Sequence, residues 1–435
     1  MFEMLKYISV LCNGKKQLLS IILIVILSGI VNCTIAQKLS NYQLQFDKRD
    51  MGDGALNIFC GFTVDFEDKD FLVLDFGGNL GHYSIEDLSL SPKYIEYSFN
   101  PIAKKLTLYR NEQNIERIEL NYIFLNITSI LMYADSGVEI WECIYNNNGE
   151  FYYPIKRGNR YKANVLFYAP DSLTVVSSYN RNPLLIQNID QSVPLNFVFL
   201  KSEIYEKQII SQPYQFSVYQ LIGKKANENR FKLFSNLVAE AIGWFEETYG
   251  EPYINPEFGT YDYPQFIFHE GNGSFNRYNM GFISASQNKF STAPNIYPLI
   301  HEIGHRWIGE YSLFIDSNQR GYAFIIETLN EFMTLMCIRD VMGMTVYDDI
   351  IESYRMQYDK IKGTSQDIHP IDVTNNNNMI VTYRKGVVLL DLYAKEIGYN
   401  KLIEAIVCFY NNKKGKYGLK YEDLKLFLDI ESLEQ

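Results

Sequence analysis

The sequence contains the run His301-Glu302-Ile303-Gly304-His305. On an α-helix, residues four apart lie on the same face, with their Cβ atoms roughly 5–6 Å apart. The two imidazoles can therefore bind one metal ion, with Glu302 beside it. Zinc held in this way keeps an open position for water and lowers the pKa of that water towards about 7. The run therefore predicts one Zn²⁺ bound by His301 and His305, with Glu302 as the general base of a hydrolase.

The residues around this run favour a helix with one buried side. Asn295 can cap the helix, and Pro298 falls in its first turn, where the missing N–H is tolerated. Apolar residues at helical spacing form the buried side: Leu299, Ile300, Ile303, Trp307 and Ile308. The alternative is an ordinary helix with two surface histidines. Two of the five histidines of the chain fall in this run, which favours the metal site.

A zinc site with two histidines needs a third protein ligand. The next predicted helix, residues 322–341, offers Glu327 and Glu331, which lie four apart and so on one face. This helix is otherwise strongly apolar, and a carboxylate in an apolar setting requires a partner. From the spacing within this helix, either glutamate could be the ligand.

Length and charge limit the class of protein. With 435 residues, the chain is expected to form two domains. Its net charge of −11 and its lack of a basic block argue against a nucleic-acid partner.

Residues 1–36 have the pattern of a signal peptide. Lys15 and Lys16 precede an uncharged run over residues 18–31, which is short for a membrane span, and small residues at 34–36 offer a cleavage site. The sequence predicts an exported protein, periplasmic or extracellular, with no stable transmembrane segment after processing. An uncleaved membrane anchor and a lipid attached to Cys33 are the alternatives.

Residues 37–205 are predicted to form an antiparallel β-sandwich domain. Short β-prone segments bounded by turn-forming clusters lie at 71–74, 105–109, 117–120, 138–141 and 164–167. Cys60 and Cys143 both lie in strand-like segments, so in an exported chain they could form a disulfide or remain buried thiols. The segment holds no cluster of chemically active residues, which favours a supporting role.

Residues 222–435 are predicted to form the catalytic domain. Aromatic and apolar residues at helical spacing predict a long amphipathic helix over 226–249, closed by Gly250. Two strand-like pieces follow at 265–268 and 280–284. The second piece is predicted to be an edge strand that holds a substrate backbone by β-addition, or else an ordinary sheet strand.

In two motifs the chain resembles the gluzincin metallopeptidases of the aminopeptidase N and leukotriene hydrolase family. Residues 301–309, HEIGHRWIG, are similar to the family's HExxHxWxG run, and residues 383–386, YRKG, are similar to its YxKG segment. The order of parts is also similar over residues 225–412. The resemblance implies an α+β protein, with an N-terminal antiparallel β-sandwich domain followed by a thermolysin-like, mostly α-helical zincin domain. It also implies that Glu302 is the base and that Tyr383 stabilises the tetrahedral intermediate.

The third ligand departs from the family's usual spacing, which would place it at Phe324, a residue that cannot bind zinc. Glu327 needs the smaller insertion between the two helices. Residues 327–335, ETLNEFMTL, are also similar to the ESLAQYSAL segment of one bacterial branch, in which the first residue is the ligand. We therefore predict Glu327 as the ligand, with Glu331 as the alternative. In the first case Glu331 is expected to orient a histidine or to bind a substrate amine.

Two further departures concern specificity. The family's GxMEN stretch, whose Glu holds the free N-terminus, corresponds to residues 274–278, which contain no acid, and Arg277 would repel an ammonium group. The chain also ends at Gln435, before the family's C-terminal helical domain, which predicts a short form with a more open site. We therefore expect an exported zinc metallopeptidase acting on a peptide or protein substrate. Aminopeptidase specificity is the first form of this activity to test, and the alternatives are a zinc endopeptidase with the same core and a catalytically inactive, peptidase-like binding protein.

Overall fold

The computed structural model describes most of the helical part of the chain and the strands of its N-terminal part. The described residues are 38–47, 55–65, 69–76, 82–87, 95–100, 102–103, 105–110, 121–130, 134–135, 138–139, 141–143, 162–177, 185–190, 197–201, 205–210, 216–221, 228–253, 266–270, 277–279, 282–285, 296–309, 312–315, 319–373 and 378–428. The predicted signal peptide, residues 1–36, lies outside them.

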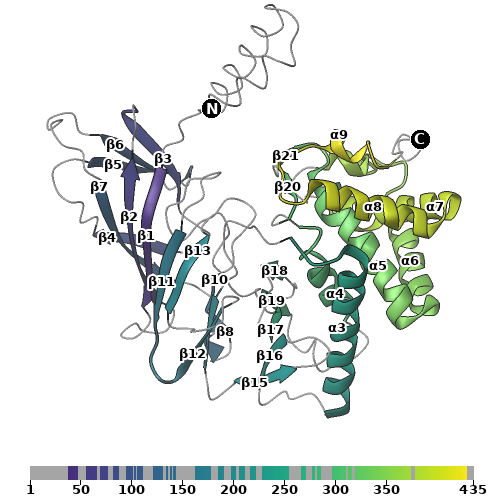
Figure 1. Cartoon of the computed structure of the whole chain (residues 1–435), viewed down its shortest axis with the longest axis horizontal. Helices are drawn as coiled ribbons and strands as arrows, with labels where there is room; N and C mark the ends of the chain where they lie inside the picture. The colour runs from purple at the N-terminus through teal and green to yellow at the C-terminus, as the bar shows by residue number, and fades with distance from the viewer. Residues whose placement is uncertain are drawn as a thin grey trace, which may run out of the picture.

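The N-terminal part is built from β-strands (Figure 1). A six-stranded sheet contains β1 (Lys38–Asp47), β2 (Ala55–Asp65), β4 (His82–Asp87), β7 (Asn121–Ile130), β11 (Lys162–Tyr168) and β13 (Leu185–Asp190). Its order is β13-β11-β1-β2-β7-β4. One three-stranded sheet contains β3 (Phe71–Asp75), β5 (Ile95–Asn100) and β6 (Lys105–Arg110). A second contains β10 (Trp141–Cys143), β12 (Leu173–Ser177) and β14 (Phe197–Lys201). β8 (Ala134–Asp135) pairs with β9 (Val138–Glu139).

Buried and more exposed side chains alternate in β1, β3, β6 and β11, where the structure describes them, as expected for sheets that bury one face. In β1, Leu44 and Phe46 are buried, whereas Gln45 and Asp47 are only partly buried. Phe46 stacks on Phe167 of β11, with ring centroids 5.4 Å apart. The strands predicted at 71–74, 105–109 and 164–167 are confirmed as β3, β6 and β11; the segment 117–120 lies outside the described residues.

The prediction of a wholly antiparallel N-terminal part is wrong in one pairing. β1 and β11 are parallel, with Leu44 opposite Val165 and Phe46 opposite Phe167. Parallel neighbours need a long connection, and the chain between these two strands, residues 48–161, provides one. A local sequence pattern carries no information about such a distant partner.

The described residues do not decide between a disulfide and buried thiols for Cys60 and Cys143. Cys60 lies in β2 opposite Leu44 and is buried. The side chain of Cys143, in β10, lies outside the described residues, so both alternatives stay open. The boundaries of the two predicted domains also stay predictions.

A five-stranded sheet leads into the helical part. Its strands are β15 (Tyr205–Ile210), β16 (Phe216–Leu221), β17 (Phe266–Glu270), β18 (Arg277–Asn279) and β19 (Phe282–Ala285), in the order β15-β16-β17-β19-β18. Of the two alternatives for residues 280–284, the ordinary sheet strand is confirmed and the edge strand is wrong. β19 lies between β17 and β18, because β18 folds back on it as a hairpin with Asn279 opposite Phe282. Among the described strands, β18 is therefore the edge on this side.

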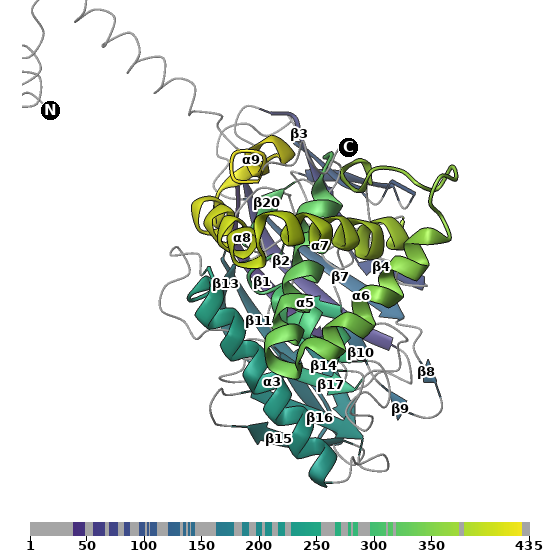
Figure 2. The same ribbon diagram turned by 90° about the vertical axis from the view of Figure 1, so that its right-hand side faces the viewer.

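The C-terminal part is mostly helical (Figure 2). Its α-helices are α3 (Glu228–Tyr249), α4 (Tyr297–Gly304), α5 (Leu329–Met342), α6 (Met344–Asp359), α7 (Gly386–Ile397), α8 (Tyr399–Lys413) and α9 (Tyr421–Leu424). Two π-helical turns, η5 (Phe324–Thr328) and η7 (Val381–Lys385), lead directly into α5 and α7. A β-rich region followed by a mostly helical one is the predicted fold class. No helix in the described part of the chain is long and apolar enough to cross a membrane.

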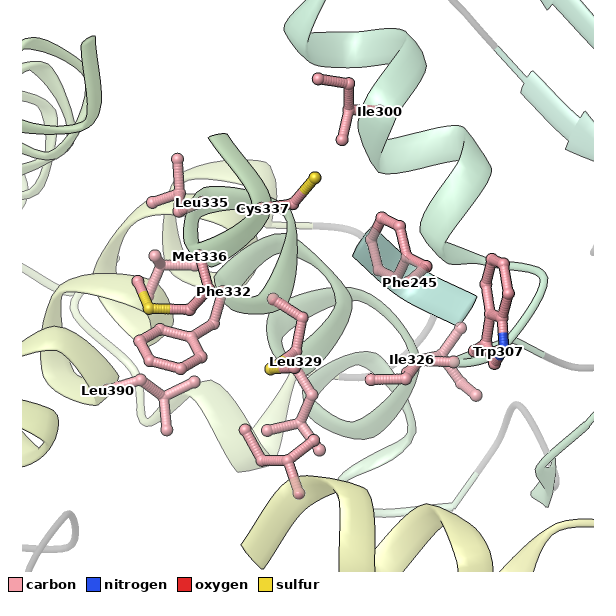
Figure 3. Close-up of a cluster of buried hydrophobic side chains, with 14 of the residues drawn as sticks. Phe245, Ile300, Trp307, Ile326, Leu329, Phe332, Leu335, Met336, Cys337 and Leu390 are labelled. Carbon is pink, nitrogen blue, oxygen red and sulfur yellow. The ribbon is translucent and has the colours of Figure 1, made fainter. Parts of the chain in front are cut away.

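Helix α5 is the centre of the helical part. Every residue from 329 to 338 is buried, and a helix buried on all sides is typical of a protein interior. Figure 3 shows side chains of α5 among others from α3, α4 and α7. A polar side chain on α5 therefore has to find its partners among neighbouring elements.

The predicted long helix is confirmed as α3, and its end is joined to the segment after the histidines. Gly250 ends the helix with a φ of 76°, a conformation that favours glycine. Its carbonyl accepts a hydrogen bond of 2.9 Å from Trp307 Nε1. The Trp307 ring stacks on Phe245 of α3, with centroids 5.3 Å apart. These contacts hold α4 against α3.

Asp391 in α7 is fully buried and joins three helices. Tyr347 and Tyr399 donate hydrogen bonds to its Oδ1, while Arg355 and Lys395 contact its Oδ2 at 2.7 and 2.9 Å. Burial alone raises the pKa of a carboxyl group, but these hydrogen bonds outweigh burial and hold the pKa of Asp391 below its ordinary value. The carboxylate thus links α6, α7 and α8.

We expect Asp391→Asn to lower the free energy of unfolding near pH 7 by roughly 2 kcal/mol, because it removes the charge of a buried group that accepts hydrogen bonds from two tyrosines and two cations. Since the folded-state pKa lies below the unfolded value, the carboxylate stabilises the fold fully above about pH 4 and loses this contribution as the pH falls further. The difference between wild type and variant should therefore shrink in acid. Urea unfolding near pH 7 and near pH 3 measures it, and an equal difference at both pH values would contradict this account.

Candidate metal centre

The histidine pair lies at the C-terminal end of α4. The helix begins at Tyr297 with Pro298 in its first turn, and Ile296, at the N-cap, makes no side-chain cap. The predicted cap, Asn295, lies outside the described residues. The predicted buried side is confirmed, with exposures of 1% or less for Leu299, Ile300, Ile303, Trp307 and Ile308. This packing fixes the direction of the two imidazoles.

A close contact sets α4 against α5. A Cβ on Gly304 would lie 2.2 Å from Asn330 Oδ1 and 2.8 Å from the Phe245 ring, so only glycine fits there. The amide of Asn330 donates a hydrogen bond of 2.8 Å to the carbonyl of His301. The glycine of the histidine run therefore allows α5 to approach the metal-binding face of α4.

Two functional candidates lie in π-helical turns, which the sequence analysis did not foresee. Glu327 lies in η5, closed by a hydrogen bond from the N–H of Leu329 to the carbonyl of Phe324. Tyr383 lies in η7, closed in the same way from Gly386 to Val381. Such turns are rare and are often found at functional sites. Each changes the direction of a side chain relative to the α-helix that follows.

The two π-turns pack against each other. Thr328 Oγ1 donates a buried hydrogen bond of 2.7 Å to the carbonyl of Thr382. A Cβ on Gly386 would lie 2.6 Å from Thr328 Cγ2, so the glycine allows this approach. Lys385 donates to Asp367 at 2.6 Å and to the carbonyl of Ile368 at 2.9 Å, which holds η7 in place. In the YRKG run, Lys385 thus anchors η7 and Gly386 leaves room for η5.

His301, His305 and Glu327 form a metal-binding group. Their ligand atoms all lie within 4.8 Å of one another. The Oε2 atom of Glu327 lies 3.4 Å from His301 Nε2 and 3.3 Å from His305 Nε2. In a tetrahedral site with zinc–ligand bonds of about 2.0–2.1 Å, neighbouring ligand atoms are roughly 3.3 Å apart. The two nitrogen–oxygen separations therefore fit a zinc ion.

The electrostatics of this group favour a cation. Burial alone lowers the pKa of a histidine, but the carboxylates of Glu331 and Glu327 outweigh it and hold the pKa of His301 well above its ordinary value. For His305, Glu327 likewise outweighs burial and raises the pKa. Burial opposes the charge of Glu327 itself, yet the two histidines hold its pKa well below the usual range. The site thus attracts positive charge, as a site for a divalent metal should.

Glu331 lies behind His301, on the side away from the ligand group. Its Oε2 is 2.6 Å from His301 Nδ1, while His301 Nε2 faces Glu327. The structure therefore brings Glu327, and not Glu331, to the metal-facing nitrogens. Of the two roles expected for Glu331 as a non-ligand, orienting a histidine matches this position.

Tyr383 and Glu302 border the ligand group. The Tyr383 ring lies 5.7 Å from that of His301, and its hydroxyl interacts with Glu327. Burial and the neighbouring carboxylates of Glu327 and Glu302 raise the pKa of Tyr383 above its ordinary value, so the phenol keeps its proton. Glu302 is partly buried and acts on both histidines. All five predicted site residues therefore lie together.

The fold as a whole is similar to that of solved structures. The crystal structure of an M1 zinc metallopeptidase from Deinococcus radiodurans matches with a TM-score of 0.61 and 13% sequence identity, and 92% of each chain is covered. The fold is that of the M1 zinc metallopeptidases. A mutant of the M1 zinc metallopeptidase from this organism, bound to a Tyr-Ser-Ala substrate, matches with a TM-score of 0.60 and 13% identity over 92% of each chain. A two-domain M1 zinc metallopeptidase mutant bound to L-tryptophan matches equally well, over 92% of this chain and 93% of that one.

No protein-family model matches the sequence, and no curated protein does. The similarity to the solved structures is therefore one of fold, at 13% sequence identity. The two runs singled out in the sequence, residues 301–309 and 383–386, lie at the same site, where the His301 and Tyr383 rings are 5.7 Å apart.

We expect Glu327→Gln to lose most of the zinc that the wild-type protein holds, because the neutral amide replaces the charged oxygen shared by the two histidines. Metal analysis after dialysis measures zinc per chain. Glu352→Gln is the matched control, since Glu352 lies on the outer side of α6 with 61% of its side chain exposed. Full zinc in Glu327→Gln would show that another group is the third ligand.

Proposed function

We propose that this protein is a zinc-dependent metallopeptidase that hydrolyses peptide bonds. The observation that carries the proposal is the buried group of His301, His305 and Glu327 beside Glu302 and Tyr383, in a chain with the M1 fold. The histidines and Glu327 would hold one zinc ion, and three protein ligands leave a position open for water or substrate. A bound zinc would supply a Lewis acid and lower the pKa of that water.

Glu302 is the general base in this mechanism. Its carboxylate lies beside both histidines and can take the proton of the attacking water and pass it to the leaving amine. Tyr383 donates a hydrogen bond to the oxygen of the scissile carbonyl as negative charge develops there. Its raised pKa suits this role, because a phenol that keeps its proton remains a donor.

Short peptides are the substrates we propose to test first. Similar M1 structures hold a Tyr-Ser-Ala substrate, L-tryptophan or L-arginine. In this chain, Glu331 is poorly suited to bind a substrate amine, because it is 2% exposed and its Oε2 lies 2.6 Å from His301 Nδ1. Aminopeptidase specificity therefore requires an acid other than Glu331.

We propose that a substrate backbone binds by β-addition to β18, which is the edge among the described strands of its sheet and lies next to α4.

We also propose that the protein is exported. Its support is the signal-like pattern of residues 1–36, with Lys15 and Lys16 before an uncharged run. N-terminal sequencing of the mature protein from the periplasm or the medium tests it. An intact N-terminus on a membrane-bound protein would favour an anchor, and lipid on Cys33 would favour a lipoprotein.

We expect Glu302→Ala to keep its zinc and to lose turnover by about 10²–10⁴-fold, since it removes the base and no ligand. Tyr383→Phe should lower kcat by about 10²–10³-fold with KM little changed, because its hydrogen bond is made in the transition state. Tyr399→Phe, which removes a hydroxyl bonded to Asp391, is the control. Undiminished turnover in Glu302→Ala would refute the mechanism.

Cleavage mapping by mass spectrometry should show chelator-sensitive hydrolysis of peptides by the purified protein. Matched peptides with free and acetylated N-termini separate the specificities. Loss of single N-terminal residues from free peptides only identifies an aminopeptidase, and internal cuts in both sets identify an endopeptidase. If neither set is cut although zinc is bound, the inactive, peptidase-like binding protein becomes the better account.

A further inference from the structure

The two carboxylate oxygens of Glu331 contact different groups: one lies at the candidate metal site and the other contacts side chains behind it. Oε2 contacts His301 Nδ1 at 2.6 Å. Oε1 accepts hydrogen bonds from the hydroxyls of Tyr297 and Tyr354 and, at 3.2 Å, from Arg384 NH1. One oxygen therefore faces a predicted zinc ligand, and the other is held by three donors.

The three donors come from different elements. Tyr297 begins α4, Tyr354 lies in α6, and Arg384 lies in η7 next to Tyr383. The Arg384 guanidinium lies over the Tyr354 ring, 4.0 Å from its centroid, and also donates to the carbonyl of Tyr383 at 3.1 Å. Glu331 and Tyr354 are 2% and 3% exposed. Packing therefore fixes the carboxylate in one orientation, and the guanidinium balances its charge.

This orientation determines which nitrogen of His301 carries the proton. A carboxylate oxygen carries only lone pairs, and at 2.6 Å it would repel the lone pair of an unprotonated Nδ1, so Nδ1 is the nitrogen that keeps its proton beside Oε2. Nε2, which faces Glu327 and His305, would then be the nitrogen that gives up its proton when a metal binds. Without the donors on Oε1, the carboxylate would be free to turn away from the imidazole.

We propose that Tyr297, Tyr354 and Arg384 are positioning residues that act on zinc binding through Glu331 and His301, an inference that rests on the proposed zinc site. We refer to Glu331 and its three donors as the Glu331 cluster. Partners of metal-ligating histidines typically contribute about 10–100-fold to metal affinity. The Glu331 cluster should therefore raise zinc affinity although none of its members is a ligand.

The Asp391 site offers a matched control on the same helix. Tyr347 and Tyr354 both lie in α6, both are at most 3% exposed, and each donates to a buried carboxylate. An arginine also contacts each carboxylate: Arg355 at Asp391 and Arg384 at Glu331. Tyr347→Phe and Tyr354→Phe thus remove the same group from similar surroundings, but only Tyr354 belongs to the Glu331 cluster.

The test measures zinc affinity of the full-length apoprotein by competition with a chromophoric chelator. We expect Glu331→Gln to weaken zinc binding about 10–100-fold and Tyr354→Phe to weaken it several-fold. Tyr347→Phe should bind zinc as the wild type does, even if both Tyr→Phe variants lower the melting temperature equally. The visible spectrum of the cobalt-substituted protein should change in Glu331→Gln and Tyr354→Phe and stay unchanged in Tyr347→Phe.

A double-mutant cycle shows whether Tyr354 acts through Glu331. Glu331→Gln combined with Tyr354→Phe should bind zinc no more weakly than Glu331→Gln alone, because the link is already broken. Additive losses, or equal affinities for the Tyr347 and Tyr354 variants, would overturn this inference. A wild-type protein that binds no zinc would overturn the proposed function as well, so the two failures are distinguishable.

Discussion

The close approach of α4 and α5 is the constraint on which the site depends. Gly304 leaves room for Asn330, and Asn330 bonds to the backbone of His301. Because α5 is buried on every side, the carboxylates at its start are carried into the interior, where they would be costly without partners. The histidines at the end of α4 are partners of both carboxylates, and Glu331 has three further donors. The same contact therefore forms the core of the helical part and assembles the metal-binding group.

Local spacing was sufficient to predict the first half of this group. Two histidines four apart on a helix must share a face, so His301, His305 and the adjacent Glu302 could be identified without a structure. Glu327 and Glu331 share a face by the same rule, and spacing could not separate them. The π-turn and the position of α5 place one carboxylate on the Nε2 side of His301 and the other on its Nδ1 side. Tyr297, Tyr354 and Arg384 were missed, since in a chain with 34 tyrosines nothing local marks two of them.

The fold shows the same division between local and distant information. The strands β3, β6 and β11 and the helix α3 follow from periodicity along the chain, and the structure confirms them. The parallel pairing of β1 with β11 and the inner position of β19 depend on which strands become neighbours. Periodicity reports which side of a segment is buried and carries no information about the partner that buries it.

The predicted ligands come from two segments, α4 and η5, and the cluster behind them reaches α6 and η7. A bound ion would therefore act as a cross-link between parts of the chain that separate on unfolding. An ion that binds only the folded chain adds RT ln(1 + [L]/Kd) to the stability, about 4 kcal/mol at a thousand times Kd. The resistance of this protein to heat would then depend on the free zinc around it, and the compartment it occupies would help to set its lifetime.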